Sequence, residues 1–205
     1  NLINESCKLA EKLGPCKKFS ETKYSKGKLP IDWYKKEVDK LVKPCYNLDW
    51  EELRARVKEF GLRHSTLSAI MPCESSSVIQ NSTNGIEPVR ALLSYKKAKN
   101  GVLKQLVPNY SSRKNYYTKA WDIKSNEPII HLAAVIQKFV DMSMSTNLYY
   151  NYDHYEDGNI PLSELVKDQI QGYKYGLKNF YYANTPDGDG DTEKEMICEG
   201  GACAI

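Results

Sequence analysis

The sequence predicts an α/β fold, because segments with helical periodicity alternate with short strand-like runs along the chain. Apolar residues recur every three or four positions over residues 129–146 and again over 161–178, which is typical of amphipathic helices. The aromatic run 180–182 follows the second of these segments and has the character of a buried strand. The strands visible in the sequence are too few to close a barrel alone.

Two helices and one strand are predicted before residue 72. The first helix ends at Gly14-Pro15 and carries three apolar positions among polar residues: Leu2, Leu9 and Leu13. The second covers residues 47–60, with Asn47 or Asp49 as its N-cap and Gly61 at its end. Its apolar face consists of Leu53, Val57 and Phe60. A strand-like run over 65–71 follows and is broken by Pro72.

The two later helices have the clearest patterns. The segment 129–146 has a wide apolar stripe, which we expect to lie against a sheet or core: Ile129, Leu132, Ala133, Ile136, Phe139 and Val140. In the segment 161–178, Pro161 stands near the first turn. Five apolar or aromatic residues lie roughly on one side of this helix: Leu162, Leu165, Ile170, Tyr173 and Leu177.

Composition indicates an ordinary soluble globular protein, with 205 residues, 41% hydrophobic and 27% charged. No run approaches the roughly 18 apolar residues of a membrane span, and the start of the chain has no signal segment. We therefore expect a cytoplasmic protein without a membrane partner. Residues 1–63 are mildly basic, but their lysines alternate with acids, which favours a solvated surface over a nucleic-acid face.

After Thr185 the chain becomes acidic and rich in Gly and Asp, which predicts a mobile tail. Near its end, Cys198 and Cys203 are separated by a segment that contains two glycines and could bring the two sulfurs together. A dithiol on a flexible arm suggests thiol exchange. The alternatives are two unrelated cysteines or half of a zinc site. Zinc needs four ligands and the nearest histidine, His154, is distant in sequence, so no metal site is expected.

Two further motifs carry possible chemistry. The serine-rich turn after Pro72 leads into a predicted helix start, because Ser77 and Gln80 have capping-box spacing. Such a turn can bind an anion, although a simple helix cap is the commoner reading. Tyrosines occur in three adjacent pairs, so a pair by itself means little. Tyr181-Tyr182 differs from the others because it lies between a well-formed helix and the tail.

Four segments, in order, resemble successive landmarks of the large subunit of class I ribonucleotide reductases: WEELRARVKEFGLRHSTLSAIMPCESSSVIQNSTNGIEPVR, QKFVDMSMSTN, YKYGLKNFYYANT and CEGGACAI. The resemblance runs from about residue 1 to 205. It implies that residues 1–185 are the carboxy-terminal part of that family's ten-stranded α/β catalytic barrel, and that residues 186–205 are a mobile redox tail.

The resemblance also implies roles for individual residues. The substrate diphosphate would bind a loop that consists of Cys73, Glu74, Ser75, Ser76 and Ser77. Cys73 stands where the family usually has Ser or Thr. Tyr181 and Tyr182 match the stacked pair that passes oxidising equivalents from the small subunit's radical, and Arg90 matches an arginine near that pair. Cys198 and Cys203 match the tail cysteines that reduce the active-site disulfide and are recycled by thioredoxin or glutaredoxin.

The implied function is the reduction of ribonucleoside diphosphates to deoxyribonucleotides for DNA synthesis. The family's radical-forming cysteine lies in an Asn-x-Cys-x-Glu setting, which no cysteine here occupies. We therefore expect this chain to need the upstream part of the large subunit as a separate chain, together with the small subunit. The di-iron tyrosyl radical cofactor is expected in the small subunit, and no cofactor is expected in this chain. The alternative is a non-catalytic nucleic-acid or protein-interaction module that uses the basic front and the tyrosines.

Overall fold

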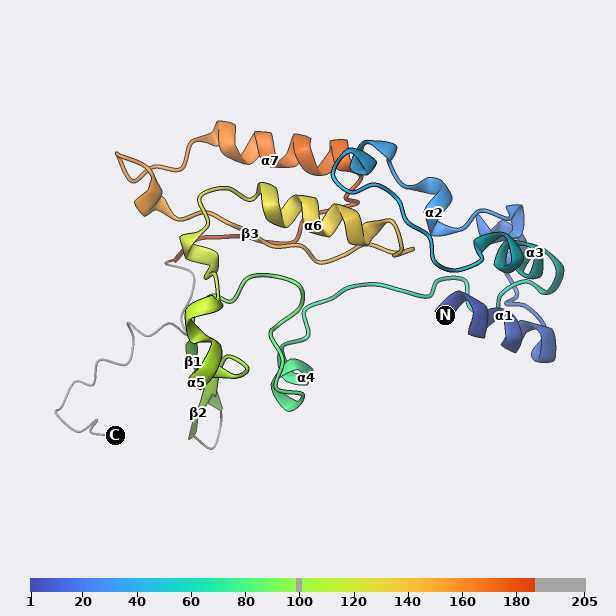
Figure 1. Cartoon of the computed structure of the whole chain (residues 1–205), viewed down its shortest axis with the longest axis horizontal. Helices are drawn as coiled ribbons and strands as arrows, with labels where there is room; N and C mark the ends of the chain where they lie inside the picture. The colour runs from blue at the N-terminus through green and yellow to red at the C-terminus, as the bar shows by residue number, and fades with distance from the viewer. Residues whose placement is uncertain (99–100, 187–205) are drawn as a thin grey trace. The chain divides into compact units, whose positions relative to one another are not determined.

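The computed structural model describes residues 1–98 and 101–186 (Figure 1). The chain divides into two compact units. Unit 1 comprises Asn1–Ile70, Ile130–Ser145 and Lys167–Phe180, and unit 2 comprises Met71–Ile129, Thr146–Val166 and the residues from Tyr181 onward. Each unit is therefore assembled from segments that are far apart in sequence. The predicted boundary between a barrel part (1–185) and a tail (186–205) stays a prediction, because residues 187–205 lie outside the described residues.

Helices and strands are mixed along the described chain, as the α/β prediction requires. The α-helices are α1 (Leu2–Leu13), α2 (Pro30–Trp33), α3 (Trp50–Phe60), α4 (Glu74–Ile79), α5 (Tyr110–Arg113), α6 (Glu127–Gln137) and α7 (Leu162–Tyr175). The strands are β1 (Leu93–Ala98), β2 (Gly101–Leu106), β3 (Leu148–Tyr149) and β4 (Ala183–Asn184). Short 3-10 turns lie at Phe19–Glu21, Tyr24–Lys26, Lys36–Lys40, Lys114–Tyr116, Ala120–Asp122 and Tyr152–His154. None of the helices in this described part is both long and apolar enough to cross a membrane.

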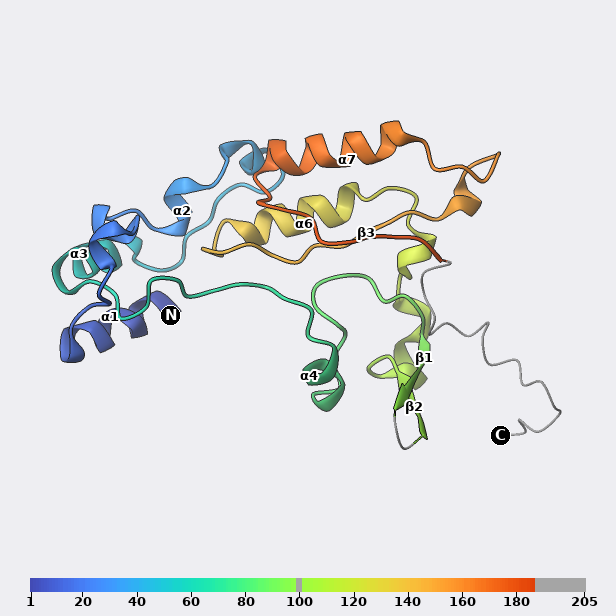
Figure 2. The same ribbon diagram turned by 180° about the vertical axis from the view of Figure 1, so that it is seen from behind.

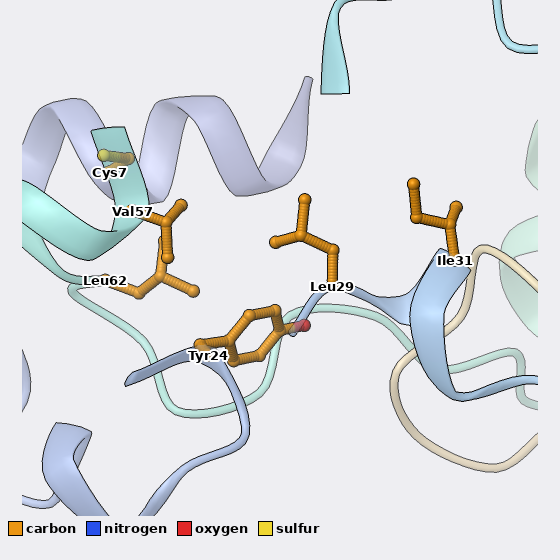
Figure 3. Packing of buried hydrophobic residues seen from close by; sticks show 6 residues of the cluster. All are labelled: Cys7, Tyr24, Leu29, Ile31, Val57 and Leu62. Atoms are coloured by element: carbon orange, nitrogen blue, oxygen red, sulfur yellow. The ribbon is translucent and has the colours of Figure 1, made fainter. Parts of the chain in front are cut away.

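The core of unit 1 is an apolar cluster between α1, α3 and the chain that connects them (Figure 3). Its buried members are Cys7, Tyr24, Leu29, Ile31, Val57 and Leu62. α3 forms as predicted, because the Asp49 side chain accepts hydrogen bonds from the backbone N–H groups of Glu51 and Glu52. The helix ends where Gly61 adopts a φ of +76°. The predicted apolar face of α3 lies against this core, because Val57 is buried in it and Leu53 and Phe60 pack against the cluster.

α1 also lies where the sequence predicts, but it buries a different face. Leu2, Leu9 and Leu13 are 62%, 41% and 65% exposed. The buried residues of α1 are the small ones, Ser6, Cys7 and Ala10. Small side chains allow the helix to approach its neighbours closely, and the leucines stay on the outside of unit 1.

α6 ends earlier than the predicted helix over 129–146. Its last residue, Gln137, donates from Nε2 to the carbonyls of Val140 and Met142 and so stabilises the turn that leaves the helix. The following residues then run beside 68–70, with backbone hydrogen bonds from Met142 to Ser68 and from Ser145 to Ile70. The strand predicted over 65–71 is therefore wrong as a full strand, because only the bridge between Ile70 and Met144 forms.

α7 spans most of the predicted segment 161–178 and lies beside α6 in both views (Figures 1 and 2). In unit 1, the rings of His131 and Tyr175 join the two helices, with centroids 4.8 Å apart. The expected apolar face is only partly buried: Leu177 is 9% exposed, whereas Ile170 and Tyr173 are 61% and 73% exposed. The sequence periodicity therefore predicted the helix correctly but did not predict which of its sides is buried.

Unit 2 contains two separate two-stranded sheets. β1 and β2 form an antiparallel hairpin with Leu93 opposite Leu106, and β3 pairs in parallel with β4. α7 lies in the connection between β3 and β4, which is the crossover that parallel strands require. The described residues thus contain a β–α–β element and no closed barrel.

The prediction that the aromatic run 180–182 is a buried strand is wrong. β4 covers Ala183–Asn184, and the side chains of Tyr181 and Tyr182 are 48% and 55% exposed. Pairing with β3 begins at Tyr182, whose carbonyl accepts from the N–H of Leu148 at 2.8 Å. The two tyrosines therefore lie at the entry to the ladder rather than inside it.

Candidate functional site

A cavity of about 250 Å³ lies within unit 2. Four stretches of the chain line it: residues 72–91, the hairpin with the segment that follows it, the start of β3, and the two residues before β4. Among the lining residues are Ser77, Arg90, Tyr181 and Tyr182. Four of the residues singled out from sequence, which lie up to 105 positions apart in the chain, therefore meet at one cavity.

The rings of Tyr181 and Tyr182 are in direct contact, with centroids 4.0 Å apart and planes inclined by 47°. Their backbone is held by the segment that leads into β3. The N–H of Tyr181 donates to the carbonyl of Thr146 at 2.9 Å, and the N–H of Tyr182 donates to Oδ1 of Asn147 at 3.1 Å. The pair is thus anchored through its main chain while both phenol rings remain half exposed.

Arg90 lines the same cavity as this pair. Its Nη2 donates to Oδ1 of Asn184 at 3.1 Å, two residues beyond Tyr182. Its guanidinium also lies over the ring of Tyr149, 5.7 Å from the centroid. Arg90 therefore joins β3 to β4 at the edge of the cavity that Tyr181 and Tyr182 line.

Glu87 is a site residue that the sequence reading missed. Its Oε1 accepts from the N–H of Asn147 at 2.7 Å, and its Oε2 accepts from Asn147 Nδ2 at 2.9 Å and from the Tyr149 hydroxyl at 2.7 Å. Burial, with the charge and hydrogen bond of Glu87, raises the pKa of the Tyr149 phenol well above its ordinary value. Tyr149 thus stays a neutral donor to the carboxylate. One signal was available in the sequence, because Glu87 stands three residues before Arg90 in the same IEPVR motif.

The serine-rich segment forms the short helix α4, which begins at Glu74 rather than after Ser77. The predicted capping box at Ser77 and Gln80 is therefore wrong. The N–H of Ser77 donates to the carbonyl of Cys73 at 2.7 Å, so Ser77 lies inside the helix, and its side chain is only 5% exposed. Cys73 precedes the helix and donates its N–H to Oδ1 of Asn84 at 2.9 Å.

The remaining predicted residues are placed as follows. Glu74 and Ser75 are the first two residues of α4, and the Ser76 hydroxyl donates to the carbonyl of Cys73 at 3.1 Å. Cys198 and Cys203 lie outside the described residues. Among residues 1–98 and 101–186, no three His, Cys, Asp or Glu side chains are grouped as a metal site would require.

Comparison with known proteins identifies the family that this chain resembles. The family model described as the ribonucleotide reductase barrel domain matches residues 1–183. The chain is 49% identical over 206 residues to a ribonucleoside-diphosphate reductase subunit alpha of Haemophilus influenzae, covering all of this chain and 27% of that protein. A subunit alpha of Escherichia coli K12 is 43% identical over 211 residues, covering all of this chain and 28% of its own length. The subunit alpha of Enterobacteria phage T4 is 45% identical over 197 residues, covering 95% of this chain and 26% of its own length.

The chain thus spans only about a quarter of the length of these relatives. The match to the barrel-domain model confirms the predicted fold class, and together with these relatives it confirms the resemblance to the family. It also agrees with the described structure, where helices and strands are mixed without closing a barrel. The chain therefore belongs to the ribonucleotide reductase family, and its residues 1–183 match the family's barrel-domain model.

Proposed function

We propose that this chain supplies part of the large subunit of a ribonucleoside-diphosphate reductase, which makes deoxyribonucleotides for DNA synthesis by a radical mechanism. The observation that carries the proposal is the cavity in unit 2, because Ser77, Arg90 and the tyrosine pair line it together. A substrate-binding segment and a redox-active pair that share one cavity are what such a reaction needs. Family membership supports the same assignment.

Tyr181 and Tyr182 are proposed to carry oxidising equivalents towards the substrate. Each phenol carries a hydroxyl proton, so each transfer must move a proton together with the electron. The 4.0 Å separation of the two ring centroids supports transfer between them. Their half-exposed rings leave room for proton exchange with water or with a neighbouring chain.

The segment from Cys73 to Ser77 is proposed to bind the substrate diphosphate. Cys73, where the family usually has Ser or Thr, is a weaker side-chain donor than a hydroxyl. Its backbone N–H is occupied by Asn84. Binding would therefore depend on the residues that follow Cys73, namely Glu74, Ser75, Ser76 and Ser77. Ser77 and Pro72 line the same cavity as the tyrosines, which supports a nucleotide position next to the pair.

Cys198 and Cys203 are proposed to return electrons to the active site after each cycle. A tail over residues 186–205 would reach at most about 65 Å when extended and roughly 25 Å as a flexible coil. The proposed external reductant is thioredoxin or glutaredoxin. The sequence does not contain the Asn-x-Cys-x-Glu setting and spans about a quarter of its relatives, so we propose that the upstream part of the large subunit completes the catalytic site. A small subunit would supply the di-iron tyrosyl radical, and the assembly would work in the cytoplasm.

The test is reconstitution with the upstream part of the large subunit and the small subunit. Tyr181→Phe and Tyr182→Phe should each abolish turnover without altering substrate affinity, because phenylalanine keeps the ring but has no phenolic proton. Matched variants at another pair, Tyr116→Phe and Tyr117→Phe, should keep most of the activity. Equal losses at both pairs would refute the relay assignment. Turnover by this chain with only a small subunit added would refute the need for the upstream part.

A further inference from the structure

We propose that Glu87 is a positioning residue for the tyrosine pair, acting through Asn147. The inference rests on the proposed relay function of Tyr181 and Tyr182 and adds a residue to it. The hydrogen bonds that link Glu87, Asn147 and the tyrosine pair all lie within unit 2. Glu87 and Asn147 are 60 positions apart, and Asn147 directly precedes β3.

The carboxylate of Glu87 fixes Asn147 at two points. Oε1 accepts the backbone N–H of Asn147 at 2.7 Å, and Oε2 accepts its side-chain Nδ2 at 2.9 Å. The Tyr149 hydroxyl donates to the same Oε2 at 2.7 Å. Asn147 and Tyr149 are only 9% and 5% exposed, so water cannot easily replace these bonds. Glu87 therefore determines both the position of the Asn147 backbone and the orientation of its side chain.

The orientation of the Asn147 amide matters because its two ends have opposite polarity. A carboxylate can only accept, so Nδ2 must face Glu87. Oδ1 is then turned towards Tyr182, where it accepts the backbone N–H at 3.1 Å. A reversed amide would place Oδ1 against a carboxylate oxygen and NH₂ against the N–H of Tyr182. Glu87 thus orients the amide so that its oxygen, Oδ1, accepts the hydrogen bond from the backbone N–H of Tyr182.

The segment that Glu87 anchors holds both tyrosines. Thr146 accepts from the N–H of Tyr181 at 2.9 Å, and Leu148 donates to the carbonyl of Tyr182 at 2.8 Å. Because the two rings are 48% and 55% exposed, core packing alone does not fix their 4.0 Å separation. The main-chain hydrogen bonds of the two tyrosines therefore contribute to this separation. A displacement of about 1 Å in reacting groups can cost on the order of 100-fold in rate.

The first test is kinetic and uses the reductase reconstituted with the upstream part of the large subunit and the small subunit. Glu87→Gln keeps the side-chain shape but sets an NH₂ group against the donors of Asn147 and Tyr149. We expect kcat to fall by about ten- to a hundredfold with no change in KM for the nucleoside diphosphate. Glu156→Gln, which alters an exposed carboxylate of unit 2, should leave both constants unchanged.

A reciprocal exchange separates positioning from a general structural role. In the Glu87→Gln/Asn147→Asp double variant, the amide at 87 donates to the carboxylate at 147, and an oxygen still faces the Tyr182 N–H. Asn147→Asp alone places two carboxylates together and should lower kcat as Glu87→Gln does. The double variant should recover most of the lost kcat. Failure of the exchange to recover activity would overturn the proposal.

The second test does not depend on catalysis. In the full chain labelled with ¹⁵N-tyrosine, the Tyr182 amide signal is identified by its loss in Tyr182→Phe. It should shift in Glu87→Gln and return towards its original position in the double variant, whereas Glu156→Gln should not move it. An unmoved Tyr182 signal in Glu87→Gln, or unchanged kcat in that variant while Tyr182→Phe is inactive, would overturn the positioning role. Full turnover by Tyr182→Phe would instead show that the relay assignment itself is wrong.

Discussion

The phenol of Tyr24 donates to Oδ2 of Asp141 at 2.8 Å and joins two parts of unit 1 that are 117 positions apart. The same carboxylate accepts the backbone N–H groups of Leu67 and Ser68, each at 2.8 Å, and the Ser68 hydroxyl at 3.1 Å. Asp141 thus gathers four donors at the place where the chain leaves α6 and runs beside residues 68–70. This explains why that stretch is irregular yet well anchored.

Asp141→Asn should lower the free energy of unfolding by about 2 kcal/mol, because one acceptor oxygen becomes an NH₂ group that faces existing donors. Urea titration monitored by circular dichroism measures the change. Asp153→Asn, at an exposed carboxylate, is the matched control and should leave the midpoint unchanged. An Asp141→Asn midpoint equal to that of the wild type would show that the four bonds are not needed for stability.

Tyr24 should make the protein sensitive to alkaline pH. Burial, with the hydrogen bond and charge of Asp141, raises the pKa of this phenol well above its ordinary value of 10.0. Above about pH 10 the unfolded chain releases the phenolic proton while the folded protein keeps it, so stability is complete below this pH and falls as pH rises. The expected slope for one such group is about 1.4 kcal/mol per pH unit.

The measurement is urea unfolding at several pH values from 8 to about 11.5. Tyr24→Phe should be less stable at pH 8 but should have a shallower decline above pH 10. Comparing the two proteins removes the effect of other groups, including Lys178, whose pKa is lowered by burial. Tyr116→Phe, at an 84% exposed side chain, should keep the wild-type slope. Identical slopes in Tyr24→Phe and wild type would contradict the prediction.

Gly172 in α7 should be a position where alanine is harmful despite its higher helix propensity. A Cβ at this position would clash with Cζ of Phe180. We expect Gly172→Ala to lower stability by about 1–3 kcal/mol through overpacking. In a Phe180→Leu background the same change should instead be stabilising by up to about 1 kcal/mol. Equal effects of Gly172→Ala in both backgrounds, measured by thermal unfolding, would show that the Phe180 ring is not the cause.

Elements determined by local chemistry could be predicted from the sequence. α3 follows from an Asp cap, an apolar face and a glycine with positive φ, all within 13 residues, 49–61. The exposed apolar residues of α1 and α7 could not be predicted, because periodicity identifies a face but not what covers it. The strand expected over 65–71 was wrong because Asp141, more than 70 positions away, binds that segment through side-chain hydrogen bonds instead.

In the candidate site, too, some residues could be predicted from the sequence and others could not. Tyr181, Tyr182 and Arg90 stand in recognisable motifs, and they line one cavity. The link between Glu87 and Asn147 crosses 60 positions and involves residue types that are common on protein surfaces. Tyr149 belongs to one of three tyrosine pairs, and no sequence pattern favours that pair. Its burial next to Glu87 is what distinguishes it. Such pairings depend on tertiary structure and cannot be read from a single sequence.

Replacing both Cys198 and Cys203 by Ser should separate the chemistry of the proposed reductase from its recycling. The disulfide formed in each cycle needs a two-electron donor, and a protein reductant is too large to enter a closed site, so thiol exchange through the tail must carry the electrons. After pre-reduction and reconstitution, the variant should complete about one turnover and stop when thioredoxin is the only reductant. A small dithiol that diffuses into the site should restore slow multiple turnover. The control, Cys16→Ser/Cys45→Ser, alters two free cysteines outside the proposed site and should keep steady-state activity with thioredoxin. Unimpaired turnover of the tail variant with thioredoxin would show that this pair is not the relay.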